Sequence, residues 1–210
     1  MSKEVIKREK EYRLNDVVIR SAEDDSDTLI VEGYAIIWEN ETLIGSEEYG
    51  FYETIARSAL DKAHMSDVVG RYNHNDTNYI LGRTRNHSLE LIPDDYGLKA
   101  IYKLQRNVQA HVDVYNMVKS GLLDKQSFAF TVRGREITRD SNGKMHVRIT
   151  DIDRLFDVSI VDVPAYDSTN LYSRSVVSVE TELEALERAS EKPCEKDYKL
   201  NIIKTMYRKN

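Results

Sequence analysis

The chain has 210 residues, of which 40% are hydrophobic, enough to form the core of one ordinary domain with modest extensions. No apolar run approaches the ~18 residues that a membrane-spanning helix needs, and the start lacks the apolar stretch of a secretory signal, so we expect a soluble cytosolic protein. A net charge of −6 argues against a general nucleic-acid binder, and a single cysteine excludes an intrachain disulfide and a multi-cysteine zinc site.

The N-terminal part divides into two kinds of sequence. Residues 1–27 mix basic and acidic side chains and end in an acidic, small-residue stretch, which predicts an arm or a lead-in strand. Residues 28–38 are rich in β-branched and aromatic side chains, and this composition favours a strand. Gly33 within it suggests a bulge or a close backbone approach.

A helix and a hairpin are expected next. Residues 53–65 place apolar side chains at helical spacing, and Thr54 can cap their start. Residues 88–92 and 98–104 flank the sequence Pro-Asp-Asp-Tyr-Gly, whose residue types form tight turns. These two runs therefore predict a β-hairpin.

The following segment predicts a second helix and a second hairpin. The helix spans residues 107–121, with Asn107 as its N-cap and Gly121 at its left-handed C-terminal end. Residues 127–138 and 145–152 then flank an Asp-Ser-Asn-Gly turn, which is a strong hairpin signal.

The last predicted strand, residues 155–163, ends at Pro164, which cannot donate a hydrogen bond to a sheet. Strands dominate residues 28–175 and two helices lie between them. We therefore expect an α+β fold, a mixed sheet or a mostly antiparallel β-barrel with helices outside. Residues 176–210 change in composition and carry two short amphipathic segments, so we expect a separate tail there.

Two polar residues are candidates for chemistry, although each also has an ordinary structural explanation. His74 lies in a polar loop with Asp76 nearby, and this pair could ligate a metal, but no matching Cys or His cluster accompanies it. Ser127 opens an aromatic-rich strand, where a hydroxyl by default bonds its own backbone. The chain lacks the Gly-x-Ser-x-Gly elbow of α/β-hydrolases and the glycine signatures of nucleotide-binding loops.

Five segments occur in a fixed order along residues 28–174: Val31-Glu-Gly-Tyr-Ala35, Asn73-His74 with Leu81-Gly-Arg83, Ser120-Gly121-Leu122 leading to Ser127-Phe128, Leu155-Phe-Asp-Val-Ser-Ile-Val161, and Pro164-Ala165-Tyr166. In this order they resemble the prohead maturation serine protease family of tailed bacteriophages, which is related to herpesvirus assemblin. The resemblance implies an assemblin-like fold, a β-barrel surrounded by helices, over residues 28–175.

The resemblance also implies a catalytic group. His74 and Ser127 match the catalytic histidine and serine of the family, and Asp157 matches the acidic third member. The residue types suit the chemistry, because an imidazole can take the proton of a serine hydroxyl while a carboxylate orients the ring. Alternatives to Asp157 as the orienting group stay open: Asp76, Asp124, Asp162 and His87.

Arg83 has two equally weighted interpretations, support of the site or a surface ion pair. The resemblance implies no metal and no organic cofactor. It implies an endopeptidase that acts in the host cytoplasm, inside the assembling procapsid, and cleaves the scaffolding region of the major capsid protein and itself. It also implies a homodimer, without nucleic-acid or membrane partners. The alternative function is a non-catalytic assembly module that binds scaffold or capsid protein.

Overall fold

The computed structural model describes residues 10–15, 20–23, 28–74 and 80–162, together with positions 179, 181, 183 and 184. The chain divides into two compact units, Met1–Tyr172 and Ser173–Asn210, and each is described by itself. The two amphipathic segments predicted in the tail lie almost wholly outside the described residues. The segment boundaries at 27/28 and 175/176 stay predictions.

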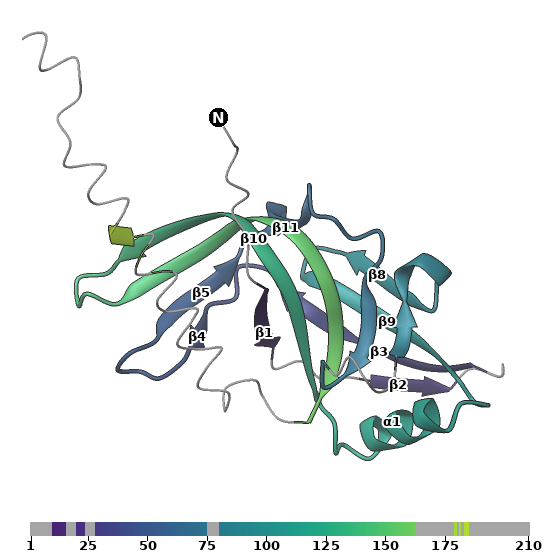
Figure 1. Ribbon diagram of the computed structural model, residues 1–210. Coiled ribbons are helices and arrows are strands. Elements are labelled where there is room, and N and C mark those ends of the chain that lie inside the picture. The colour runs from purple at the N-terminus through teal and green to yellow at the C-terminus, as the bar shows by residue number, and fades with distance from the viewer. Residues whose placement is uncertain are drawn as a thin grey trace, which may run out of the picture. The chain divides into compact units, whose positions relative to one another are not determined.

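The first unit is built mainly from strands (Figure 1). The strands are β1 (Glu11–Asn15), β2 (Arg20–Glu23), β3 (Thr28–Ile37), β4 (Thr42–Ile44), β5 (Phe51–Ile55), β6 (Val69–Tyr72), β7 (Ile80–Arg83), β8 (Leu89–Pro93), β9 (Gly97–Gln105), β10 (Lys125–Arg139) and β11 (Met145–Val161). The helical elements are α1 (Gln109–Lys119) and two 3-10 turns, η1 (Arg57–Leu60) and η2 (Thr84–Asn86).

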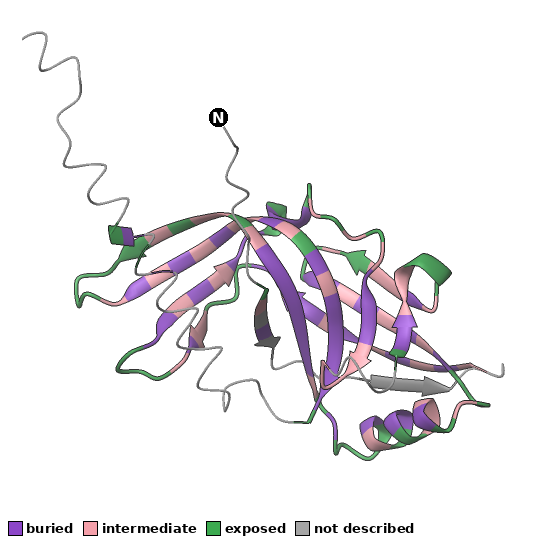
Figure 2. Cartoon of the chain, in the orientation of Figure 1, coloured by how far each residue is buried: buried purple, intermediate pink, exposed green. Residues whose placement is uncertain are grey.

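The strands form two sheets. One has the order β1-β10-β11-β5-β4, with β6 also paired to β11 and β7 paired to β6. The other has the order β2-β3-β9-β8, and α1 packs beside β2, β3 and β9. Along the strands buried residues alternate with less buried ones, as expected when one face of each sheet lies on the core (Figure 2).

Strand β11 organises the larger sheet. It pairs antiparallel with β10 along its length, through several register shifts. Its other edge is shared by two parallel partners: β5 pairs with the segment around His146 to Ile149, and β6 pairs with Asp157 to Ile160. The C-terminal part of β11 therefore lies between β10 and β6.

The core holds β6 close to the second sheet. Tyr102 on β9 is fully buried, and a Cβ atom added to Gly70 on β6 would lie 2.8 Å from its ring. Only glycine permits this approach without displacing a buried aromatic side chain. Phe128 and Phe130 are also buried and stack at 5.0 Å between ring centroids. Burial of each side chain stabilises the fold by about 1.5–3 kcal/mol.

The prediction of a β-barrel surrounded by helices is wrong. The described residues of the first unit contain one α-helix, and their strands form two open sheets whose ends do not pair into a closed barrel. The helix predicted over residues 53–65 is also wrong, because β5 and η1 occupy that segment. Ala56 between them has extended backbone angles, and the apolar side chains at helical spacing become buried along a strand end and a 3-10 turn.

The other elements predicted within residues 28–163 are confirmed, with corrections at their ends. Both hairpins form, but the strand predicted over 155–163 is continuous with its predecessor in β11. Helix α1 has Val108 rather than Asn107 as its N-cap, and Gly121 follows it with a φ of 75°. The bulge of β3 lies between Tyr34 and Ile36.

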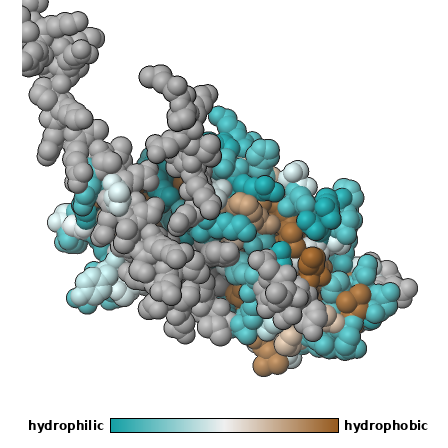
Figure 3. Space-filling model, in the orientation of Figure 1, coloured by the Kyte–Doolittle hydropathy of each residue, from teal (hydrophilic) through white to brown (hydrophobic). Residues whose placement is uncertain are grey.

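No helix among the described residues is long and apolar enough to cross a membrane. Hydrophilic residues cover most of the described surface on the face drawn in Figure 3.

Candidate active site

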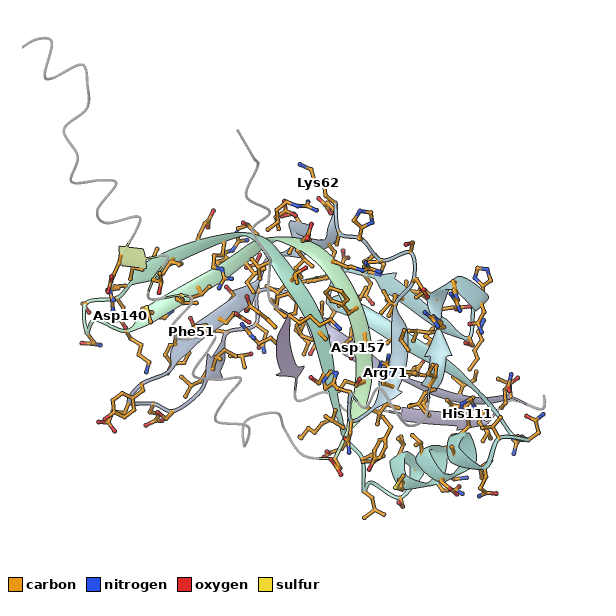
Figure 4. The ribbon with its side chains drawn as sticks, viewed as in Figure 1. Phe51, Lys62, Arg71, His111, Asp140 and Asp157 are labelled. Carbon is orange, nitrogen blue, oxygen red and sulfur yellow. The ribbon has the colours of Figure 1, made fainter. Side chains whose placement is uncertain are left out.

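Two neighbouring strands carry three small polar side chains. In the ladder between β10 and β11, Ser127 lies opposite Ser159, and Asp157 stands two residues before Ser159 on the same strand. Residues two apart in a strand share a face, so Asp157 and Ser159 point to the same side of the sheet. Figure 4 shows Asp157 on the C-terminal part of β11, next to β10. All three residues are buried.

A strained turn brings a histidine to this face. His74 lies two residues past the end of β6, and both Asn73 and His74 have left-handed backbone angles, with φ of 53° and 52°. This conformation costs a residue other than glycine about 1–3 kcal/mol. Two hydrogen bonds hold the turn, since the Asn73 N–H donates to the Ile160 carbonyl at 3.0 Å and the Asn73 side chain accepts the Asp162 N–H at 3.0 Å.

The structure brings His74, Ser127 and Asp157 together. Nδ1 of His74 is 2.5 Å from Oδ1 of Asp157, and Nε2 is 2.6 Å from Oγ of Ser127. The imidazole is 16% exposed and the carboxylate 8%. A carboxylate only accepts hydrogen bonds, so Nδ1 donates to Asp157 and Nε2 is left to accept from the hydroxyl. In this arrangement the ring can take the Ser127 proton while Asp157 stabilises the resulting imidazolium.

Ser159 also belongs to this cluster. It lies within the motif Leu155–Val161, but the sequence predicted no role for it. Its hydroxyl lies 2.9 Å from Oδ1 of Asp157 and 3.1 Å from Nδ1 of His74. The hydroxyl donates to the carboxylate and so helps to hold it in place beside the ring. The spacing of two residues from Asp157 within a strand is the signal that could have found it.

A backbone group also reaches the site. The Ser127 hydroxyl lies 2.7 Å from the carbonyl oxygen of Arg13 on β1, as well as 2.6 Å from His74. One hydroxyl proton therefore has two acceptors. The sequence could not predict this contact, because the acceptor is a main-chain carbonyl far from Ser127 in the chain.

Arg83 makes a bidentate ion pair with Asp67, at 2.6 and 2.9 Å, and both side chains are about a quarter exposed. The hydrogen bonds from Arg83 lower the pKa of Asp67 below its usual range. The ion pair with Asp67 is one of the two roles expected for Arg83, and its support of the site stays a prediction.

The other proposed orienting groups have contacts of their own. His87 ends η2 in a left-handed conformation, and Asp124 is exposed beside Lys125. Asp162 donates its backbone N–H to the turn that carries His74. Asp76 lies outside the described residues, within which no three His, Cys, Asp or Glu side chains form a group suited to a metal ion.

Comparison with known proteins identifies a family for most of the chain. Neither the comparison with curated proteins nor that with solved structures finds a match. A family model described as the caudovirus prohead serine protease matches residues 15–184, a range that includes the three clustered residues. Because this match covers most of the chain, the chain belongs to the caudovirus prohead serine protease family.

Proposed function

We propose that the chain is a serine endopeptidase in which Ser127 is the nucleophile, His74 the general base and Asp157 the group that orients the imidazole. The observation that carries the proposal is the continuous series of hydrogen bonds from Ser127 through His74 to Asp157, in a chain of a serine protease family. The alternative of a non-catalytic assembly module would not need these three side chains in register.

The proposed reaction has two halves. Nε2 of His74 takes the hydroxyl proton as Oγ of Ser127 attacks the carbonyl carbon of the scissile peptide bond, giving a tetrahedral oxyanion. The imidazolium, stabilised by Asp157, then gives that proton to the departing amine, and an acyl-enzyme remains. A water molecule, deprotonated by the same nitrogen, attacks the ester carbon. The imidazolium then returns the proton to Oγ of Ser127 as the acyl–oxygen bond breaks, which releases the acid and regenerates Ser127 and His74. The reaction as proposed uses no metal and no organic cofactor.

The proposed substrates are the scaffolding region of the major capsid protein and the protease chain itself, cleaved inside the assembling procapsid. Family membership supports a role in capsid maturation. We also propose a homodimer as the active form, with Arg83 supporting the site. Sedimentation should find dimers at the concentrations where the chain cleaves; full activity in a monomer would contradict this part.

The direct test is co-expression of the full chain with its major capsid protein, followed by mass spectrometry of all fragments. Ser127→Ala should reduce capsid-protein and self-cleavage by roughly 10⁴–10⁶-fold. Ser58→Ala, at an exposed serine away from the cluster, is the matched control and should cleave normally. Cleavage by Ser127→Ala at the normal rate would contradict the proposal; a wild type that binds capsid protein without cutting it would favour the assembly module.

Residues 176–210 are proposed to dock the enzyme to scaffold or capsid protein, or to be removed by self-cleavage. Every proposed catalytic residue precedes them. A chain that ends at residue 175 should therefore fold and cleave a peptide in solution, yet enter procapsids poorly, as measured by the protease content of purified procapsids. Failure of this shortened chain to fold would show that the tail belongs to the catalytic domain.

A further inference from the structure

Strand β1 covers the edge of β10 at Ser127. The two strands pair antiparallel, with Leu14 opposite Ser127 and Arg13 opposite Phe128. The Ser127 hydroxyl contacts the Arg13 carbonyl oxygen at 2.7 Å, and Ser127 is fully buried. Because β1 ends the order of this sheet, its departure would leave the edge of β10 open for another extended peptide.

The Arg13 side chain fills a buried acidic site. Its guanidinium donates to both carboxylate oxygens of Glu53 on β5, at 2.5 and 2.7 Å, and lies 5.5 Å from the centre of the Phe130 ring. Arg13 is 5% exposed and Glu53 3%. Burial raises the pKa of Glu53, and the Arg13 charge opposes that rise. A buried carboxylate is costly without a cation beside it, so the position next to Glu53 is built for a basic side chain.

A second pair of charges lies beside the first. Glu11 on β1 accepts from Arg13 at 2.5 Å and from Arg135 on β10 at 2.8 Å, and Arg135 is 8% exposed. Glu11 and Arg13 are two residues apart and point to the same side of β1. The domain thus supplies Glu53 to pair with a basic side chain and Arg135 to pair with an acidic one. An extended Glu-x-Arg sequence places its two charged side chains at the right spacing for both pairs.

We propose that β1 occupies the substrate-binding edge of the protease, and that Glu53 and Arg135 select substrates with a basic residue preceded two positions earlier by an acidic one. This inference rests on the proposed function of Ser127. The substrate joins β10 as an antiparallel strand and places its basic side chain against Glu53. In the structure the Ser127 hydroxyl is hydrogen-bonded to the Arg13 carbonyl oxygen of its own chain. Strand β1 therefore competes with substrate for the edge of β10. Arg13 also precedes the range matched by the family model, which begins at residue 15.

The first experiment compares full chains that differ at residue 13. The probe is a quenched fluorescent peptide, Lys-Glu-Tyr-Arg-Leu-Asn-Asp-Val, which repeats residues 10–17. An intramolecular strand competes at an effective concentration on the order of millimolar, so weakening it with Arg13→Ala should raise kcat/KM roughly ten-fold or more. Arg139→Ala, at an exposed arginine of β10, is the matched control and should leave the rate unchanged.

The second experiment tests the selectivity of Glu53. In the Arg13→Ala chain, the Arg peptide is compared with the same peptide carrying Gln at that position. Glu53→Gln should reduce the preference for the Arg peptide roughly 30-fold or more, because it removes one partner of a buried charge pair. Glu136→Gln, at an exposed carboxylate, should keep the preference.

A binding measurement gives a result that does not depend on turnover. In full chains that carry Ser127→Ala, fluorescence anisotropy of the labelled Arg peptide should show tighter binding when Arg13→Ala is added. If Arg13→Ala does not fold, Arg13→Lys keeps the charge with fewer hydrogen bonds and should give a smaller rise in the rate of cleavage and in binding.

The outcomes separate this inference from the proposed function. Cleavage that persists in Ser127→Ala overturns the proposed function and, with it, this inference. Cleavage that needs Ser127, but does not rise in either Arg13 variant and shows no dependence on Glu53, overturns the inference alone. A parallel loss of activity, peptide binding and melting temperature in the Arg13 variants also overturns it, since β1 would then be a structural strand only.

Discussion

Two histidine–carboxylate pairs involve the same long strand, β11, and their surroundings differ. His74 and Asp157 lie 2.5 Å apart at its C-terminal part and are 16% and 8% exposed. His146 and Glu41 lie 2.8 Å apart at its other end and are 33% and 51% exposed. Figure 4 shows this separation through the labels of Asp157 and of Asp140, whose carboxylate lies 3.7 Å from His146.

The second ring nitrogen distinguishes the two histidines. Nε2 of His74 meets the Ser127 hydroxyl, whereas Nε2 of His146 faces the carboxylate of Asp140. The His146 ring also stacks on Tyr52, at 5.3 Å between centroids. A histidine beside a carboxylate is therefore not by itself a sign of catalysis. What distinguishes His74 is its burial and the hydroxyl on its second nitrogen, which suit the proposed role of proton acceptor.

The largest expected effect is the difference in cleavage between alanine variants of the two histidines. His74→Ala should lower kcat/KM for a peptide substrate by roughly 10⁴–10⁶-fold, because the proposed catalytic residues act as a unit. His146→Ala removes the surface counterpart and should cleave at nearly the normal rate. Equal losses in the two variants, with melting temperatures unchanged, would remove the proposed distinction between them.

A smaller loss is expected at the carboxylate of Asp157. Asp157→Asn should lower kcat roughly 10³–10⁴-fold, since an amide can donate to Nδ1 and favour the wrong imidazole tautomer. Glu41→Gln makes the same change at the surface pair and should have no effect on cleavage. Steady-state kinetics of both variants with one peptide provides the measurement, and a normal kcat for Asp157→Asn would exclude this residue as the orienting group.

Ser159→Ala should have an effect smaller again. A hydrogen bond to a charged group is worth about 1.5–3 kcal/mol, so its loss should lower kcat by roughly 10- to 150-fold. Because the hydroxyl contacts Asp157 and His74, we expect it to act through these two side chains, and KM should stay unchanged. A rise in KM without a fall in kcat would place Ser159 in substrate binding instead.

The smallest effect concerns stability at the surface pair. The backbone N–H groups of Lys144 and Asn142, together with His146, lower the pKa of Asp140 below its ordinary value. The native state therefore favours the ionised carboxylate, and its small stabilisation is present above pH ~4 and is lost as the pH falls through the lowered pKa.

Urea unfolding of the wild type and of Asp140→Asn at several pH values measures this contribution. The difference in unfolding free energy between the two chains should be present at pH 7 and shrink below pH ~4, while cleavage at pH 7 stays the same. A difference that grows as the pH falls would contradict the assigned direction.

The local sequence predicted the hairpins correctly because their turns contain residue types that favour tight turns. The Pro-Asp-Asp-Tyr-Gly and Asp-Ser-Asn-Gly turns predicted both hairpins, and the carboxylate of Asp94 indeed accepts the N–H groups of Tyr96 and Gly97 in the first. Residues 53–65 misled because Ile55 and Leu60 are buried equally well at the end of a strand and in a 3-10 turn as in a helix. Spacing alone could not separate these outcomes.

Local sequence patterns could not predict which distant strands pair with one another. The parallel pairing of β11 with both β5 and β6 joins segments far apart in the chain, so the open sheets could not be told from a closed barrel. His74, Ser127 and Asp157 were assembled through a family resemblance, not through spacing. The contact between Ser127 and the Arg13 carbonyl had no sequence signal, since any residue supplies that oxygen.

The position of His74 past the last paired residue of β6 has a consequence for amide hydrogen exchange. Ser127 and Asp157 lie within the ladder of the two longest strands, where exchange needs opening of the whole sheet. His74 is tied to that ladder through the two hydrogen bonds of the turn at Asn73. We expect this turn to open without opening of the whole sheet. On warming, exchange at Asn73 should therefore accelerate before exchange in β10 and β11, and the position of His74, the proposed base, should be lost before the fold.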